Sequence, residues 1–180
     1  MKLQISKALS VEEIEPDDAE GIYAIIDRSR EHLRTYLPWV DFNQSARDVA
    51  DFIAASKQLQ AIKNGGNYVI RYEGEIAGVI GLHHIDWSNH HTSIGYWLAG
   101  EMQGQGIMTA AVSGLVAYVF DELGLNRVEI RCATDNKKSR AIPERLGFTW
   151  EGRIREGEWI YDHYVDHEVY GLLKKEWQKH

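Results

Sequence analysis

Residues Ile94 to Thr109 read IGYWLAGEMQGQGIMT, and this stretch decides how the rest of the chain is interpreted. A β-prone run ends, Gly104 and Gly106 follow one residue apart, and a long apolar segment begins at Ala110. This order predicts a glycine turn at the N-terminus of a helix. The first N–H groups of a helix have no intrahelical partner and the helix dipole is positive there, so the turn can hold a phosphate. A Cβ at either glycine would keep a ligand away from the backbone.

Two common phosphate-binding loops do not fit this turn. A Walker-type loop requires Lys after its last glycine, whereas Gly106 is followed by Ile107. A dinucleotide-binding fingerprint requires a third glycine where this chain has Thr109, and it usually lies early in a βαβ unit. An ordinary strand-turn-helix with two glycines remains the alternative, so the turn by itself leaves the ligand open.

A second motif follows the helix, which is expected to end near Gly124. After a β-branched run, residues Asp135 to Phe148 read DNKKSRAIPERLGF. The turn at Gln103 to Met108 resembles the pyrophosphate loop Gln/Arg-x-x-Gly-x-Gly/Ala of the GCN5-related N-acetyltransferases (GNAT superfamily), departing only at Met108. The second segment resembles their signature Asn-x-x-Ser-x-x-(apolar)-x-x-(basic)-Leu-Gly-Phe. Within the superfamily, the loop and the segments Arg155 to Trp159 and Tyr164 to His167 are similar to ribosomal-protein N-terminal acetyltransferases of the RimL and RimJ type.

The resemblance covers most of the chain and implies the GNAT fold. This is an α/β fold with a mixed, mostly antiparallel central sheet, flanking helices and a splayed pair of strands, here Ser93 to Leu98 and Arg127 to Ala133. Hydrophobic periodicity and turn residues predict the elements in chain order. The first half is expected to contain a strand at Leu3–Ala8, a helix begun by Pro16, a Pro-broken connection at Leu33–Val40, a helix at Ser45–Ile62 and a turn at Asn64–Asn67. An antiparallel meander of strands follows at Tyr68–Tyr72, Glu75–Ile85 and His91–Leu98, and two closing strands are expected at Thr149–Ile160 and Tyr164–Leu172.

Acetyl-CoA is the co-substrate that the resemblance implies. Its pantetheine arm would lie between the splayed strands and pair with the main chain of Trp97, Leu98 and Ala99. The loop would bind the pyrophosphate through the amides of Gln103, Gly104, Gln105, Gly106, Ile107, Met108 and Thr109. By resemblance, Asn136 hydrogen-bonds the pantetheine arm and Ser139 lies near the sulfur. Asn is also a preferred N-cap, so Asn136 has a structural role open to it as well.

Direct acetyl transfer requires a neutral amine to attack and a thiolate to leave, so a base assists the reaction. The resemblance assigns Ser139 to the departing sulfur and Glu158 to the amine proton. Strand alternation would put Glu156 on the same face as Glu158, so periodicity alone does not choose between them, and a solvated strand face remains open for both. A histidine base, His83 or His84, is the second candidate. Trp39, in the aromatic connection Tyr36 to Trp39, is expected to wall the acceptor groove, with plain helix-connection packing as its alternative.

A metal site is not expected. The histidine pairs are not accompanied by an HExxH motif, and the single cysteine, Cys132, excludes an internal disulfide and a cysteine cluster. Its position in a strand favours core packing for the thiol.

Length and charge agree with one acetyltransferase domain spanning 1–180. The formal net charge of −7 disfavours non-specific nucleic-acid binding and suits a cationic acceptor. No signal-peptide pattern is seen at the N-terminus and the apolar runs are too short to span a bilayer, so no membrane partner and a cytoplasmic location are expected. A homo-oligomer is suggested only by family habit.

Three functions remain open on sequence grounds. The first is acetyl transfer to a primary amine, foremost the N-terminal α-amino group of a protein. The second is acetylation of a small amine, such as a polyamine or an antibiotic. The third is a catalytically weak acyl-CoA-binding protein that keeps the loop without the chemistry.

Overall fold

One eight-stranded sheet organises the molecule in the computed structural model, which describes residues 1–177. The strands follow the spatial order β1-β2-β3-β4-β5-β6-β8-β7, and every neighbouring pair is antiparallel except β5 and β6. Their bounds are β1 Lys2–Gln4, β2 Leu9–Glu13, β3 Gly66–Tyr72, β4 Glu75–Leu82, β5 His91–Leu98, β6 Arg127–Ala133, β7 Thr149–Ile160 and β8 His163–Leu173. The expected α/β fold with a mostly antiparallel sheet is confirmed.

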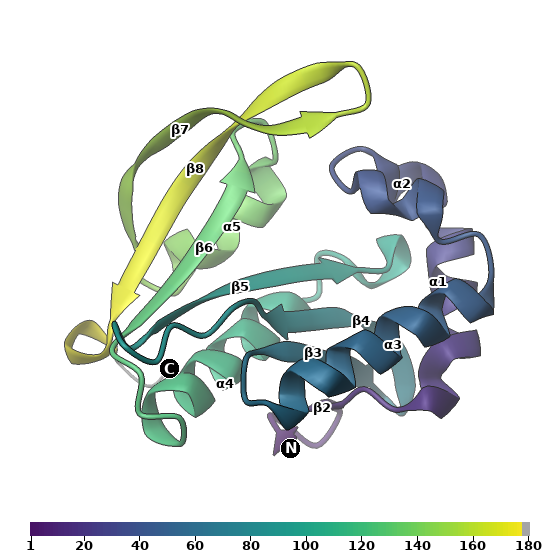
Figure 1. The fold of residues 1–180 in the computed structure, drawn as a ribbon, viewed down its shortest axis with the longest axis horizontal. Helices are drawn as coiled ribbons and strands as arrows, with labels where there is room; N and C mark the ends of the chain where they lie inside the picture. The colour runs from purple at the N-terminus through teal and green to yellow at the C-terminus, as the bar shows by residue number, and fades with distance from the viewer. Residues whose placement is uncertain (178–180) are drawn as a thin grey trace.

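The parallel pair β5 and β6 is joined only at one end. Residues 91–93 of β5 pair with residues 127–129 of β6, and the pairing ends at Ser93 and Glu129. Beyond this point the two strands diverge, and the sheet opens into a V with β1–β5 in one arm and β6–β8 in the other (Figure 1). The splayed pair of strands predicted from sequence is therefore present.

Helices cover both faces of the sheet. Those with the bounds η1 Pro16–Asp18, α1 Ala19–Arg28, α2 Arg30–Arg34, η2 Pro38–Phe42 and α3 Ala46–Ala61 precede the meander, and η3 Gly100–Met102, α4 Ile107–Asp121, α5 Lys137–Arg145 and η4 Lys174–Glu176 follow it. The two layers have separate apolar cores. Ile22 of α1 and Ile53 of α3 pack with Val79 in one core, whereas Leu115 of α4 packs with Ile94 and Ile130 in the other.

Helix α4 is the most buried of the α-helices and begins at the glycine turn. Its buried side chains recur on nearly every turn because the helix packs against strands of both arms of the V, β2 and β5 in one arm and β6 in the other. A helix that is apolar on most sides is stable only when it is packed on most sides. The position of the glycine turn is thus fixed by the core.

The strand expected at Leu3–Ala8 is present but shorter than predicted, since β1 ends at Gln4. The chain instead turns between β1 and β2, where the Ser6 hydroxyl accepts the N–H groups of Ala8 and Leu9. Local side-chain hydrogen bonds of this kind favour a turn over a continuous strand. Within the expected connection at 33–40, the structure has the end of α2 and the start of η2, and β4 ends at Leu82 rather than at Ile85.

The other predicted elements are confirmed. Pro16 begins the first helical turn, Ser45 caps α3, the meander β3-β4-β5 is antiparallel, and β7 and β8 close the sheet. Within residues 1–177, no helix combines the length and the apolar character needed to cross a membrane.

Candidate active site

The glycine turn opens onto a cleft of about 1440 Å³. Gly104 and Gly106 have φ values of +74° and +76°, in the left-handed region that favours glycine, and Gly106 is the N-cap of α4. A Cβ built on either residue meets no atom within 4 Å, so both glycines face open space. The first N–H groups of α4 lie at this point, where the helix dipole is positive.

Two cationic side chains, Lys138 and Arg145, lie beside the turn and hydrogen-bond to residues of the turn and of the first turn of α4. Lys138 donates to Oε1 of Gln103 at 2.9 Å, and Nε2 of Gln103 lies 2.6 Å from Nε2 of His32. Lost hydration, followed by the charge of Lys138, lowers the pKa of His32, so a neutral ring can accept from the Gln103 amide. Arg145 reaches the Thr109 hydroxyl at 3.4 Å. Gln103 therefore ties α2 to α5 across the turn, beside two positive charges that suit a phosphate.

Only part of the segment Trp97 to Ala99 directs its main chain into the V. The Ala99 N–H donates to the Ala77 carbonyl at one end of the β4–β5 pair, and the His83 N–H donates to the Ser93 carbonyl at the other end. Main-chain groups alternate in direction along an antiparallel strand, so Trp97 faces β4 together with Ala99. The main chain of Leu98 points the other way, toward the opening between β5 and β6.

Asn136 and Ser139 meet two other side chains at the base of the V. Oδ1 of Asn136 accepts the Ser139 N–H at 3.1 Å, so Asn136 is the N-cap of α5. The Ser139 hydroxyl lies 3.3 Å from the Tyr96 hydroxyl and 3.3 Å from Sγ of Cys132. Asn136 and Ser139 both line the cleft, so capping and ligand contact are compatible.

Tyr96 and Cys132 were missed as site residues. Lost hydration raises the pKa of Tyr96 well above its usual range, and burial raises the pKa of Cys132, against the hydrogen bonds from Ser139 and Tyr96. Both groups are therefore protonated near neutral pH. Tyr96 lies in the β-prone run before the glycine turn, but only the tertiary structure brings its hydroxyl next to Ser139 of α5.

Glu156 and Glu158 are not related by strand alternation, which corrects the sequence argument. The register of β7 against β8 shifts between Ile154 and Glu158, and Glu156 has a φ of +50°. A bulge of this kind interrupts the pleat, so the two side chains need not share a face. Oε2 of Glu158 lies 3.1 Å from Nε2 of His167, a residue directly opposite Ala133 of β6.

Trp39 stands behind the cleft wall. Its ring lies 5.9 Å from the ring of Trp97 at an interplanar angle of 52°, and Trp97, Tyr36 and Leu37 line the cleft itself. In the part of the chain that the structure describes, the lining includes neither Trp39 nor Glu158. The lining of the cleft in this region is thus formed by neighbours of Trp39 in sequence and space, not by Trp39 itself.

His83 lies on the face of β5 that looks toward α1 and α3. Its Nδ1 is 2.9 Å from the Ser93 hydroxyl, and the missing side chain of Gly95 leaves room for the ring. Lost hydration and the nearby Arg131 lower the pKa of His83, so the ring is neutral near pH 7. Across residues 1–177, no group of three or more His, Cys, Asp and Glu side chains is arranged to hold a metal ion.

A V-shaped sheet with a glycine turn at its mouth defines a class of acyl-transfer proteins, and comparison with known families agrees. The profile described as "Acetyltransferase (GNAT) domain" matches residues 9–149, most of the chain. The chain therefore belongs to the GNAT family of acetyltransferases.

Relatives and solved structures place it more closely. YdaF of Bacillus subtilis (strain 168), named as a candidate ribosomal N-acetyltransferase, is 38% identical over 97% of this chain and 96% of its own length. RimL, described as a ribosomal L7/L12 alpha-N-protein acetyltransferase in complex with coenzyme A, has a TM-score of 0.93 at 25% identity, covering 96% of this chain and 98% of that one. The microcin C7 self-immunity acetyltransferase MccE, in complex with acetyl-CoA and AMP, has a TM-score of 0.90 at 29% identity, with 94% of each chain covered.

Proposed function

We propose that this protein transfers the acetyl group of acetyl-CoA to the α-amino group of a protein N-terminus. The observation that carries the proposal is the opening of the sheet between β5 and β6, with a glycine turn and the N-terminus of α4 at its mouth. Support for a protein acceptor comes from the likeness to YdaF and RimL, whose names specify ribosomal proteins.

The residues present fit an acyl-CoA. A Cβ at Gly104 or Gly106 would project into space that nothing in the described chain fills, as expected where a ligand approaches the backbone. The amides of Gly104 to Thr109 would bind the pyrophosphate, with Lys138 and Arg145 adding positive charge. The Gln103 N–H, also expected there, donates to the Gly100 carbonyl instead. Leu98 would pair with the pantetheine arm through its main chain, and Asn136 would add a side-chain hydrogen bond.

The chain's own groups then serve the two protons of the reaction. The Ser139 hydroxyl, which donates to the Tyr96 hydroxyl in this structure, would turn to donate to the sulfur as it becomes a thiolate. Tyr96, held protonated, donates its own O–H to the Ser139 carbonyl and would keep the serine in place. Glu158 would accept the proton of the attacking amine, with His167 fixing its carboxylate. An α-amine has a pKa of about 8, so roughly a tenth of it is already neutral at pH 7, far more than of a lysine side chain.

Cofactor binding is tested by filling the glycine turn. Gly106→Trp is expected to abolish measurable binding of coenzyme A in isothermal titration calorimetry, while circular dichroism shows the fold intact. Gly124→Trp is the matched control, because Gly124 also has a positive φ, +68°, with no atom within 4 Å of a built Cβ, and lies beyond the other end of α4. Equal affinity in the two variants would overturn the placement of the pyrophosphate.

The acceptor is tested by release of free thiol from acetyl-CoA. Peptides with free N-termini are expected to react faster than the same peptides with blocked N-termini and an internal lysine. Faster reaction of a polyamine or an antibiotic amine would favour the second candidate. Binding of acetyl-CoA without thiol release on any acceptor would mark a binding protein.

A further inference from the structure

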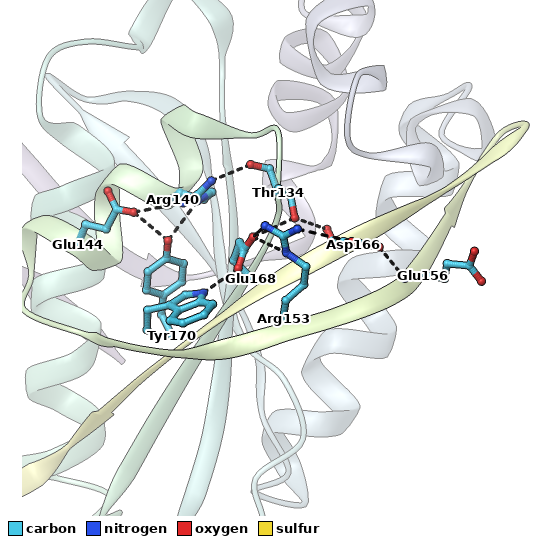
Figure 2. Close-up of polar contacts among 9 residues, drawn as sticks. Thr134, Arg140, Glu144, Arg153, Glu156, Asp166, Glu168 and Tyr170 are labelled. Carbon is cyan, nitrogen blue, oxygen red and sulfur yellow. Dashed lines mark hydrogen bonds and ion pairs between the residues drawn. The ribbon is translucent and has the colours of Figure 1, made fainter.

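A polar network lies on the face of α5 turned away from Ser139. It consists of Thr134, Arg140, Glu144, Trp150, Arg153, Asp166, Glu168 and Tyr170, which we call the Glu168 network (Figure 2). Arg140 and Glu144 are one helical turn apart on α5, and the other members come from the β6–α5 loop, β7 and β8. The network connects the strands of the second arm to the loop that carries Asn136.

Glu168 is the buried centre of this network, with only 2% of its surface exposed. Its Oε1 accepts from Arg153 at 2.9 and 2.5 Å and from the Thr134 hydroxyl at 3.1 Å, and its Oε2 accepts from the Trp150 indole at 2.7 Å. Burial alone would raise the pKa of this carboxyl, but the bonds from Trp150, Arg153 and Thr134 outweigh it and hold the pKa below its usual value. Glu168 is therefore a fixed, ionised anchor at neutral pH.

Thr134 is the point at which the anchor meets the active-site loop. Its hydroxyl reaches Glu168 and the Asp166 carbonyl, its N–H donates to the Asp166 carbonyl at 3.0 Å, and its own carbonyl accepts from Arg140 at 2.9 Å. Two residues later comes Asn136, which caps α5 and holds the Ser139 N–H. Every main-chain polar group of Thr134 is thus tied down directly before the candidate site.

Arg140 closes the network from the helix side. It follows Ser139 in the sequence, and its Nε donates to the Tyr170 hydroxyl at 3.1 Å. Tyr170 in turn donates to Glu144 at 2.8 Å. The first turn of α5 is therefore held through Asn136 on the cleft side and through Arg140 on the opposite side.

We propose that Glu168, through Thr134 and Arg140, positions Asn136 and Ser139 for acetyl transfer. This inference rests on the proposed function, and it makes Glu168, Thr134 and Arg140 positioning residues that touch neither cofactor nor acceptor. The physical reason is that a loop joining a strand to a short helix has few contacts of its own. A displacement of about 1 Å at a reacting group can lower a rate about a hundredfold.

The first test removes the Thr134 hydroxyl, which links the loop to Glu168 and also reaches the Asp166 carbonyl. Thr134→Val keeps the shape of the side chain and the paired charges but deletes the hydroxyl that reaches Glu168. We expect kcat/KM for acetyl-CoA to fall between about tenfold and about a hundredfold, with KM for the acceptor amine unchanged. Thr134→Ser keeps the hydroxyl, so its kcat/KM is expected to stay within about twofold of the value for the unaltered protein. This change is much smaller than the loss expected for Thr134→Val.

The second test removes the charge of the anchor and has a matched control. Glu168→Gln places an amide N–H group against donors, and the same loss of kcat/KM for acetyl-CoA is expected. Glu151→Gln is the control, because Glu151 of β7 is likewise a carboxylate paired with an arginine of a neighbouring element. The Arg127 guanidinium of β6 donates to its two carboxylate oxygens at 2.5 and 2.6 Å. Arg127 begins β6, whereas Thr134 follows its end, so the control loses an ion pair far from the loop.

The results separate this inference from the proposed function. Proportional losses of activity and of melting temperature in all variants, Glu151→Gln included, would make the network merely structural and overturn the inference. Full activity in Thr134→Val, or no recovery in Thr134→Ser, would also overturn it. Failure of the unaltered protein to bind coenzyme A would instead overturn the proposed function.

Discussion

Ser139 is the side chain on which the proposed cofactor binding and the proposed chemistry both depend. Its N–H is held by Asn136, and its hydroxyl contacts Tyr96 and Cys132, so a single residue connects β5, β6 and α5 at the base of the V. Ser has no pKa near neutrality, and its expected contribution is a hydrogen bond that strengthens as charge develops on sulfur.

Ser139→Ala is expected to lower kcat much more than it weakens coenzyme A binding. Loss of a hydrogen bond to a charged group costs about 1.5–3 kcal/mol, which corresponds to roughly a tenfold to hundredfold lower rate. Steady-state kinetics and calorimetric affinity for coenzyme A check this. Equal losses in rate and affinity would make Ser139 a residue that binds the cofactor without assisting the leaving group.

Glu158→Gln tests the base. The amide keeps the size of the side chain and can still bond His167, but it cannot take a proton, so the rate at pH 7 is expected to fall about a hundredfold or more. Raising the pH above about 8 should recover much of this loss, because the α-amine is then increasingly neutral. A pH–rate profile of both proteins provides the measurement.

Glu156→Gln is the control for Glu158. The Glu156 side chain points away from its neighbours in Figure 2, and its N–H, not its carboxylate, is bonded to Asp166. Little change is expected. If Glu158→Gln also keeps full activity, or if high pH brings no recovery, then a histidine such as His83 or a water molecule takes the proton.

Among the elements, α3 shows how local sequence sets a boundary. Ser45 is its N-cap, with the hydroxyl accepting the Asp48 N–H at 3.3 Å and donating to the Asp48 carboxylate at 2.8 Å. Asp48 reaches back to accept the Gln44 N–H at 3.0 Å. Two otherwise unpaired N–H groups are satisfied by this exchange.

Ser45→Ala is expected to lower the free energy of unfolding by about 1 kcal/mol, the usual cost of losing an N-cap side chain. Urea denaturation followed by circular dichroism measures it. Gln58→Ala, an exposed position in the same helix, is the control and should change stability little. A similar result for both substitutions would show that the cap contributes nothing to α3.

The hairpin at the end of the second arm of the V also contacts α2. The hairpin of β7 and β8 reaches toward α2 (Figure 1), where the Arg34 guanidinium lies 4.9 Å from the centre of the Tyr161 ring. Arg34 is itself paired with Asp41 of η2 at 2.5 Å. This contact bridges the layer that carries the aromatic wall and the hairpin that carries Glu158.

For the whole molecule, acid should be the destabilising direction. Glu168 has a folded-state pKa below its ordinary value of 4.5, so the unfolded chain takes up the proton first as the pH falls. The stability that Glu168 contributes is therefore complete above about pH 5 and is lost as the pH falls through the folded-state pKa. The folded-state pKa is lowered in the same way for three other carboxyl groups, those of Glu12, Asp48 and Glu129.

Urea unfolding between about pH 3 and about pH 7 checks this prediction. The free-energy difference between the unaltered protein and Glu168→Gln is expected to stay constant above pH 5 and to shrink below pH 4.5. A difference that is independent of pH over this range would show that the Glu168 carboxyl titrates alike in the folded and unfolded chains.

Much of the architecture was predictable because it is encoded over short distances. Pro16 at a helix start, Ser45 at a cap and the alternating runs of the meander each act through neighbours a few residues away. The glycine turn and the segment from Asn136 to Phe148 carried the resemblance to the GNAT family, and with it the opening between β5 and β6. The strand predicted at Leu3–Ala8 ends early, at Gln4, because the Ser6 side chain forms a turn that periodicity does not reveal.

The amino-acid sequence alone thus determined the family, the order of the elements and the glycine turn before α4, since these depend on local backbone preferences. Tyr96 and Cys132 beside Ser139, Trp39 behind the wall, the bulge between Glu156 and Glu158, and the buried Glu168 network appeared only when distant strands were paired. The sheet brings together residues more than forty positions apart, such as Tyr96 and Ser139. Which hydroxyl meets which is set by strand register, and register depends on the packing of the entire sheet rather than on any one segment.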